Sequence, residues 1–253
     1  MIWHMITAGL AALAPAPAQA QDAPAPTPPP APQRVLVVLA HPDDELTMAP
    51  AIAAMARQGS RVRLVYATPG DAGPGFSGLP KGEALGAVRR AEAECSGKTL
   101  GVAEVIHLGF GDGKLAEHVR DGSLAKALQG HIAQADLVLT WGPDGGYGHA
   151  DHRLAHAITT QIAQGQRADV RPRVLFVGLP LGSIAALPPL ADWAETDPAL
   201  LTAAIAYTSA DLAAAAQATA CHVTQFDQAT RTAMAAAFDA TIWRGRVHFR
   251  PAF

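Results

Sequence analysis

The chain has 253 residues, of which 49% are hydrophobic and 16% are charged, and its formal net charge is -3. This length and hydrophobic content suit one well-buried domain and are short for two. The sequence holds no basic tract, which argues against electrostatic binding of nucleic acid or of an anionic membrane surface. We therefore expect a small neutral or polar substrate.

The N-terminal segment resembles an export signal. Residues 1–20 contain a short apolar stretch and end in Ala18-Gln19-Ala20, the small-x-small pattern of a secretory cleavage site. Lys and Arg are absent from its first positions, so a disordered start in a cytoplasmic protein is the alternative. This apolar stretch is too short to span a bilayer, and no other apolar run has spanning length. Residues 21–33, nearly all Ala and Pro, indicate a linker to a single domain over 34–253, in the periplasm or outside the cell.

Strand-like runs alternate with alanine-rich helical stretches along the rest of the chain. The runs lie at 34–40, 61–67, 104–108, 135–141 and 173–179. Short, nearly continuous runs of Val, Leu and Ile indicate strands buried on both faces, hence a mainly parallel sheet with right-handed crossovers. The expected fold is α/β, a three-layer α/β/α Rossmann-like sandwich.

The helical stretches are expected at 49–59, 83–100, 203–220 and 225–239, with a terminal strand at 241–249. The first two end at Gly59 and Gly101, because glycine commonly stops helices. Between them, the glycine-rich residues 68–81 indicate a substrate-access loop. We expect Cys95 and Cys221 to be buried free thiols. An exported protein could pair them, but the sequence gives no sign that they meet.

The residues after the first strand have the composition of a metal site. Residues 41–45 read His-Pro-Asp-Asp-Glu, one imidazole and three carboxylates, and parallel α/β sheets bind ligands at this end of their strands. A dinucleotide-binding protein would carry glycines here, whereas three carboxylates would repel phosphate. Capping of a helix explains one acidic residue but not this composition.

A second cluster, Tyr-Gly-His-Ala-Asp-His at 147–152, completes the site. Catalytic zinc usually takes three protein ligands and leaves one position open for water. His41, Asp44 and either His149 or His152 would supply that set, and the residues alone leave these two histidines interchangeable. Asp43 and the remaining histidine would be free for proton transfer.

These motifs resemble the signature of the PIG-L or LmbE-like zinc N-deacetylase family, whose members remove acetyl groups from N-acetylglucosamine-type sugars. Order and spacing agree over about 35–225, and Ala150 replaces a proline that is common in the family. The similar segments are AHPDDE at 40–45, RRAE at 89–92 followed by LGV at 100–102, GFGDG at 109–113, GHADH at 148–152 and HVTQ at 222–225.

The resemblance implies that His41, Asp44 and His152 bind one zinc ion per chain, which Fe2+ or Co2+ could replace. Asp43 would be the general base that takes a proton from water whose pKa the metal lowers toward about 7. The resemblance makes His149 the second catalytic group.

The remaining roles concern the oxyanion and the substrate. His149, together with Tyr147, would stabilise the developing oxyanion, and Asp151 would hold His149 in its donating form. By the resemblance Arg89, Asp112 and His222 would lie near the substrate.

The expected activity is hydrolysis of an N-acetyl or other N-acyl group from a small-molecule sugar or glycoconjugate. The alternative is a non-catalytic metal- or sugar-binding protein of the same fold, against which the presence of both Asp43 and His149 argues. The sequence leaves the oligomeric state open, a homo-oligomer included.

Overall fold

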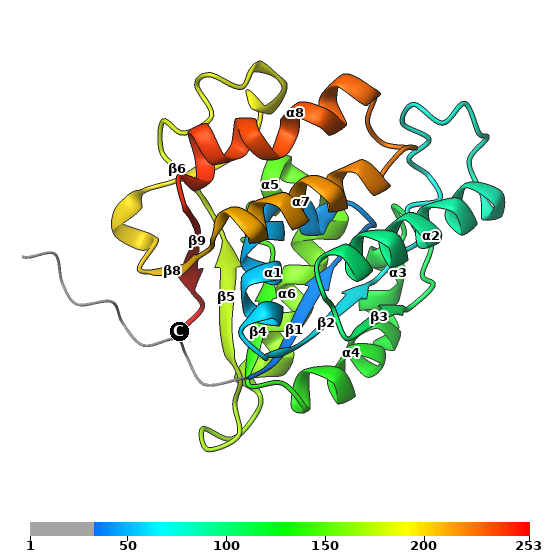
Figure 1. Ribbon diagram of the computed structural model, residues 1–253. Coiled ribbons are helices and arrows are strands. Elements are labelled where there is room, and N and C mark those ends of the chain that lie inside the picture. Colours follow the sequence, from blue (N-terminus) through cyan, green and yellow to red (C-terminus); the bar gives the residue numbers. More distant parts are fainter. Residues whose placement is uncertain (1–32) are drawn as a thin grey trace, which may run out of the picture. The chain divides into compact units, whose positions relative to one another are not determined.

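The central sheet has seven strands in the order β3-β2-β1-β4-β5-β9-β8 (Figure 1). The computed structural model describes residues 33–253, so the signal peptide expected over 1–20 and nearly all of the expected linker lie outside the described residues. Strands β1 to β5 run parallel, and β9 lies antiparallel to both β5 and β8. The mainly parallel sheet is therefore confirmed.

The strands are β1 Arg34–Leu39, β2 Arg61–Tyr66, β3 Glu104–His107, β4 Leu137–Thr140, β5 Arg173–Val177, β6 Leu179–Pro180, β7 Glu195–Thr196, β8 Ala203–Ala206 and β9 Arg246–Pro251. The helices are α1 Ala49–Arg57, α2 Glu83–Thr99, α3 Leu115–Arg120, α4 Ser123–Ala133, α5 Gly145–Gly148, α6 Ala150–Gln164, α7 Ser209–Cys221 and α8 Gln228–Phe238. Within residues 33–253, none of these helices is both long and apolar enough to cross a bilayer.

Alternate side chains of β1 enter two hydrophobic cores, one on each face of the sheet. Val35, Val37 and Leu39 pack with residues of α1, α2, α7 and α8. Leu36 and Val38 pack with residues of α3, α4 and α6 on the opposite face. Because both faces are covered, the continuous apolar run of this strand is explained. The three-layer α/β/α arrangement is confirmed.

Two element boundaries differ from the sequence prediction. Residues 203–206, expected to begin a helix, form the edge strand β8, and the terminal strand begins at Arg246 instead of residue 241. The helix starts later because Thr208 and Asp211 form a capping box, in which the Thr208 backbone and hydroxyl both donate to the Asp211 carboxylate at 2.7 Å. Alanine favours a helix, so the composition of 203–206 predicts one, whereas pairing with β9 makes these residues a strand. Gly59 and Gly101 follow the ends of α1 and α2 with φ of 90° and 73°, as predicted.

Cys95 and Cys221 form a disulfide, so the expectation of buried free thiols is wrong. Their Cα atoms lie 5.8 Å apart although the residues are 126 positions apart in the sequence. Helices α2 and α7 pack against each other, which brings the two thiols together. Cys95 is exposed and Cys221 is partly exposed. The bond cross-links two helices on the same face of the sheet.

Candidate active site

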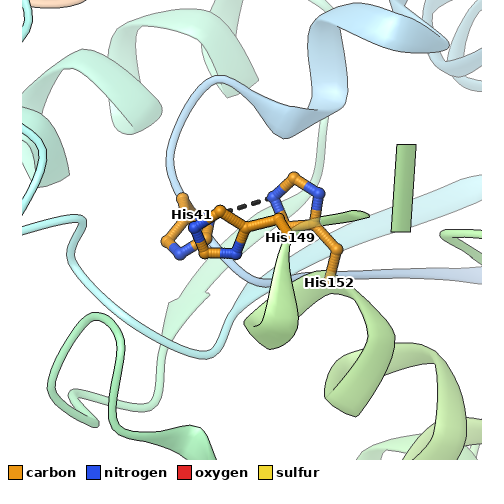
Figure 2. Close-up of side chains that lie close together, drawn as sticks. All are labelled: His41, His149 and His152. Carbon is orange, nitrogen blue, oxygen red and sulfur yellow. Dashed lines mark hydrogen bonds between the residues drawn. The ribbon is translucent and has the colours of Figure 1, made fainter. Parts of the chain in front are cut away.

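Three atoms with lone pairs converge at the carboxyl ends of β1 and β4. The Nε2 atom of His152 lies 3.1 Å from Nδ1 of His41 and 3.1 Å from Oδ1 of Asp44. The same two atoms of His41 and Asp44 are 3.8 Å apart. All three side chains are buried. Figure 2 shows His41, from the loop after β1, facing His152, from the first turn of α6.

Contacts on the far side of each imidazole favour a proton there and a lone pair at the converging atom. Nδ1 of His152 is 3.1 Å from the carbonyl oxygen of Gly145, which can only accept, so the proton of this imidazole belongs on Nδ1 and Nε2 carries a lone pair. Nε2 of His41 lies 3.0 Å from Asp112 and 3.5 Å from Asp151. The angles are poor for a hydrogen bond. Even so, two carboxylates make Nε2 the favoured position for the proton of His41.

Asp44 is held as a carboxylate with one oxygen free. Its Oδ2 accepts hydrogen bonds from the backbone amides of Ala40 and His41, both at 2.9 Å, and from Nε1 of Trp141 at 3.0 Å. Burial would raise the pKa of Asp44, but the neighbouring His152 and His41 hold it well below its usual value. Its Oδ1 therefore faces the two imidazoles as an anion. Although burial opposes the shift, the carboxylates around His41 in turn hold the pKa of its imidazole well above the usual value.

This donor set fits a metal ion. Ligand atoms about 2.1 Å from a tetrahedral zinc lie about 3.4 Å from one another. The separations of 3.1, 3.1 and 3.8 Å between His41, Asp44 and His152 match that spacing. Three lone-pair atoms at this distance repel one another unless a cation lies between them. The residues therefore form a candidate metal site. In the described part of the chain, ligand atoms also lie within 4.8 Å of one another in His41, His149 and His152, and in His41, Asp112 and Asp151.

Asp43 stands beside this site in an unusual conformation. Its φ is 102°, in the left-handed region that non-glycine residues rarely occupy. Its Oδ2 lies 3.2 Å from Nη2 of Arg89, which also donates to the Pro42 carbonyl at 2.6 Å. Burial and the charge of Asp44 raise the pKa of Asp43 to about 6, although Arg89 opposes the shift. A carboxylate with such a pKa can both take and return a proton near neutral pH.

Glu45 holds the backbone of Asp43 by a hydrogen bond, a role that the sequence did not indicate. One oxygen of Glu45 accepts from the Asp43 backbone amide at 3.0 Å. The other accepts from Ser96 at 2.5 Å and lies 2.6 Å from Nε2 of His222. Glu45, Ser96 and His222 are completely buried. Cys95 and Cys221 immediately precede Ser96 and His222, so the disulfide joins the two helices that hold this carboxylate.

The sequence of the chain matches a known protein family. Residues 36–163, about half of the chain, match the PIG-L family, described as GlcNAc-PI de-N-acetylase. The chain belongs to this family. The 1D-myo-inositol 2-acetamido-2-deoxy-alpha-D-glucopyranoside deacetylase of Nakamurella multipartita is 37% identical over 173 residues, which cover 57% of this chain and 59% of that relative. The chain thus matches less than two thirds of this curated relative's length.

Solved structures share the fold. The N,N'-diacetylchitobiose deacetylase of Pyrococcus horikoshii superposes with a TM-score of 0.61 at 20% identity, covering 86% of this chain and 83% of its own. A 4-carboxy-2-hydroxymuconate hydratase of Pseudomonas putida superposes with a TM-score of 0.60 at 17% identity, covering 87% and 95%. Since one structure is a hydratase by name, the shared fold alone does not fix the reaction.

In this PIG-L family chain, the two histidines of the second motif lie in different elements, His149 just before α6 and His152 within it. His149 is the N-cap of α6, and its Nδ1 accepts from the Asp151 backbone amide at 3.2 Å. Its proton therefore belongs on Nε2, and the contact that orients it comes from the backbone instead of from the expected carboxylate. The Asp151 carboxylate accepts from the Gly113 amide at 2.7 Å and faces His41. Burial and the nearby His41 and His152 lower the pKa of His149, which favours the neutral donor.

Tyr147 lies at the mouth of the site. Its side chain is 48% exposed, and its ring centroid lies 5.7 Å from that of His149 and 5.5 Å from that of His152. It is therefore accessible to a ligand, as the prediction of an oxyanion contact requires.

The three residues expected near the substrate make protein contacts. Asp112 lies beside His41 and accepts from the Ala72 amide at 3.1 Å. Arg89 is 3% exposed, and its guanidinium also donates to Gly70, where a Cβ would lie 2.1 Å from Nη1. His222 is completely buried against Glu45. Their direct contact with a substrate stays a prediction, whereas their contacts to the site's own residues are observed.

Trp141 was missed by sequence reasoning. Besides bonding Asp44, its indole stacks on His152 with ring centroids 4.3 Å apart and planes 5° apart. Its position just after β4 was the available signal, because the carboxyl end of each parallel strand faces the site. It aligns two of the candidate ligands at once.

Proposed function

We propose that this protein is a zinc-dependent N-deacetylase that acts on an N-acetylglucosamine-containing substrate. The observation that carries the proposal is the convergence of ligand atoms of His41, Asp44 and His152 beside Asp43, a carboxylate whose pKa is raised to about 6. Membership of the PIG-L family and the name of the Nakamurella relative support the same reaction class.

The residues have distinct roles in the proposed hydrolysis. His41, Asp44 and His152 would hold the zinc, which when bound lowers the pKa of water toward about 7 and polarises the acyl oxygen. Asp43 takes a proton from the attacking water and passes it to the leaving nitrogen, because an amine leaves poorly until it is protonated. Nε2–H of His149 donates to the oxyanion that develops on the acyl oxygen. Arg89 keeps Asp43 in position.

Export to the periplasm or cell exterior is part of the proposal. The Cys95–Cys221 disulfide favours an oxidising compartment, where such bonds persist. An exported enzyme of this kind would meet amino sugars of the cell wall or the environment. Fractionation of cells that express the full chain tests this, and a cytoplasmic protein of undiminished length would contradict it.

The test of the reaction is release of acetate from N-acetylglucosamine and from N,N'-diacetylchitobiose by zinc-loaded protein, with glucosamine and the de-N-acetylated disaccharide as the respective amine products. Asp43→Asn should abolish release while zinc content and sugar binding are kept. Asp169→Asn is the matched control, because Asp169 is an exposed carboxylate paired with Arg167 in a surface loop. If the unmutated protein binds both sugars and hydrolyses neither, the protein is a non-catalytic sugar-binding protein and the proposed reaction is wrong.

A further inference from the structure

An apolar cavity opens directly beside the proposed catalytic groups. Its volume is about 200 Å³, and Asp43, Asp44, His152 and Tyr147 line one end. The other walls are hydrophobic and come from segments far apart in the sequence. Six side chains make most of these walls: Leu46, Trp141, Trp193, Phe226, Met234 and Phe238.

The cavity differs from a packing gap in the core. Trp193, Phe226, Met234 and Phe238 are large apolar side chains that remain partly exposed. Exposed apolar surface costs roughly 25 cal/mol for each Å², and contiguous surface of this kind commonly marks a ligand site. On the polar side of the site, Arg89 and Asp112 already form hydrogen bonds and ion pairs with other protein groups, so they are less available to a ligand. An apolar group is therefore the better fit to this cavity.

The position of the cavity indicates which part of a substrate enters it. An acyl carbon under attack must lie within reach of Asp43, and Asp43 lines this cavity. A group that continues from that carbon away from the nitrogen can extend along the apolar walls. We propose that the cavity binds the acyl chain of the substrate and that this enzyme prefers medium-chain N-acyl amino sugars over N-acetyl ones. The inference rests on the proposed hydrolysis of an N-acyl group.

The volume sets the length of the chain. A cavity of about 200 Å³ is many times the roughly 10–15 Å³ that one water needs, so it has room for a chain of several methylenes. Beyond Trp193 and Phe238 the adjoining space shrinks to about 20 Å³, which is enough for one water. A hexanoyl chain should therefore fit, and a dodecanoyl chain should not.

The cavity walls also come from a part of the chain that the family match does not cover. Trp193, Phe226, Met234 and Phe238 all follow residue 163, where the match to the family ends. His41, Asp44 and His152 lie inside the match. Acyl selectivity can therefore differ between this protein and other members while the reacting groups stay the same.

The experiment compares kcat/KM for N-acetyl-, N-butanoyl-, N-hexanoyl- and N-dodecanoylglucosamine with the zinc-loaded protein. We expect at least a tenfold rise from acetyl to hexanoyl, since each methylene in an apolar pocket contributes about tenfold or more, and a fall at dodecanoyl. The hexyl glycoside of N-acetylglucosamine, which carries its chain on the other side of the amide, should gain nothing. A gain for this glycoside without one for the hexanoyl sugar would overturn the assignment.

A variant of α8 links any preference to the cavity. Met234→Trp should lower the hexanoyl-to-acetyl ratio of kcat/KM about tenfold by filling the cavity. Ala236→Phe, on the exposed side of the same helix, is the matched control and should leave the ratio unchanged. An unchanged ratio in folded Met234→Trp protein would overturn the inference.

A binding measurement keeps the inference separate from the proposed function. Zinc-loaded Asp43→Asn protein should bind N-hexanoylglucosamine at least tenfold more tightly than N-acetylglucosamine in a calorimetric titration. Hydrolysis of the acetyl sugar with no preference for hexanoyl would overturn only the acyl pocket. Absence of all hydrolysis would overturn the proposed function, and the titration would then still decide whether the cavity takes the chain.

Discussion

Replacing Asp43 with asparagine should make the metal-free protein more stable while it abolishes hydrolysis. Asp43 lies with Asp44 and Glu45 in a buried cluster of carboxylates, and its pKa is raised from 3.8 to about 6. That difference of about two pH units corresponds to roughly 3 kcal/mol of unfavourable free energy in the folded state, at about 1.36 kcal/mol for each unit. The 3.2 Å contact with Arg89 offsets part of the benefit of removing the charge. We expect a net gain of roughly 1–3 kcal/mol.

The pH dependence gives this prediction its sign. A carboxylate whose folded pKa is raised binds protons more readily in the folded state, so the penalty is absent below the unfolded pKa and complete above the folded one. The advantage of Asp43→Asn should therefore be full at pH 7.5 and fade between about pH 6 and pH 4, the interval set by the pKa shift of Asp43. The positive φ should not contribute, because asparagine tolerates it as well as aspartate does.

The assay is urea unfolding of chelator-treated protein at pH 7.5 and pH 4.5, with Asp169→Asn as the control. The control should leave the free energy of unfolding unchanged, because its ion pair is exposed. If Asp43→Asn is less stable than the unmutated protein at pH 7.5, or if the difference is the same at both pH values, the argument from charge crowding is refuted.

Three further predictions concern catalysis and stability. His149→Ala should keep its zinc and lose roughly a hundredfold in kcat, because one oxyanion donor is removed. His152→Ala should lose zinc and activity together. Metal analysis and acetate release distinguish the two outcomes. Replacing both Cys95 and Cys221 with serine should lower the free energy of unfolding by roughly 2–5 kcal/mol in urea, because a long cross-linked loop is released. Asp211→Asn should cost about 1–2 kcal/mol at pH 7, because the Asp211 carboxylate pairs with Arg57 at 2.8 Å and caps α7. The folded pKa of Asp211 lies below 3.8, so its contribution is complete above that value and this cost should vanish as the pH falls through the folded pKa.

Each of these has a contrary outcome. Zinc that leaves with His149 and stays with His152 would reverse their assigned roles. A serine double variant as stable as the oxidised protein would mean that the cross-link contributes nothing to folding. If the cost of Asp211→Asn is the same at pH 3 as at pH 7, the stabilisation does not come from the charge of the Asp211 carboxylate.

The sequence indicates the chemistry of the site better than its surroundings. His41 and Asp44 follow a strand with an unmistakable pattern, and the rule that ligands gather at carboxyl ends of parallel strands brings them to His152. The supporting contacts have no local signal. Trp141 reaches Asp44 across 97 positions of the sequence, and His222 reaches Glu45 across 177, so only the tertiary fold brings them together.

The same reason explains the other misses. Cys95 and Cys221 meet because α2 packs against α7, and the sequence around each cysteine does not indicate its partner. The Asp151 backbone, not its side chain, orients His149, a distinction that depends on where α6 begins. Alanine at 203, 204 and 206 favours a helix, and pairing with β9 overrides that preference.

The most direct test of a zinc-dependent deacetylase is acetate release from N-acetylglucosamine as zinc is returned to chelator-treated protein. We expect no release without metal and a rise that reaches its plateau at one zinc per chain. Full release by the metal-free protein would contradict the central claim.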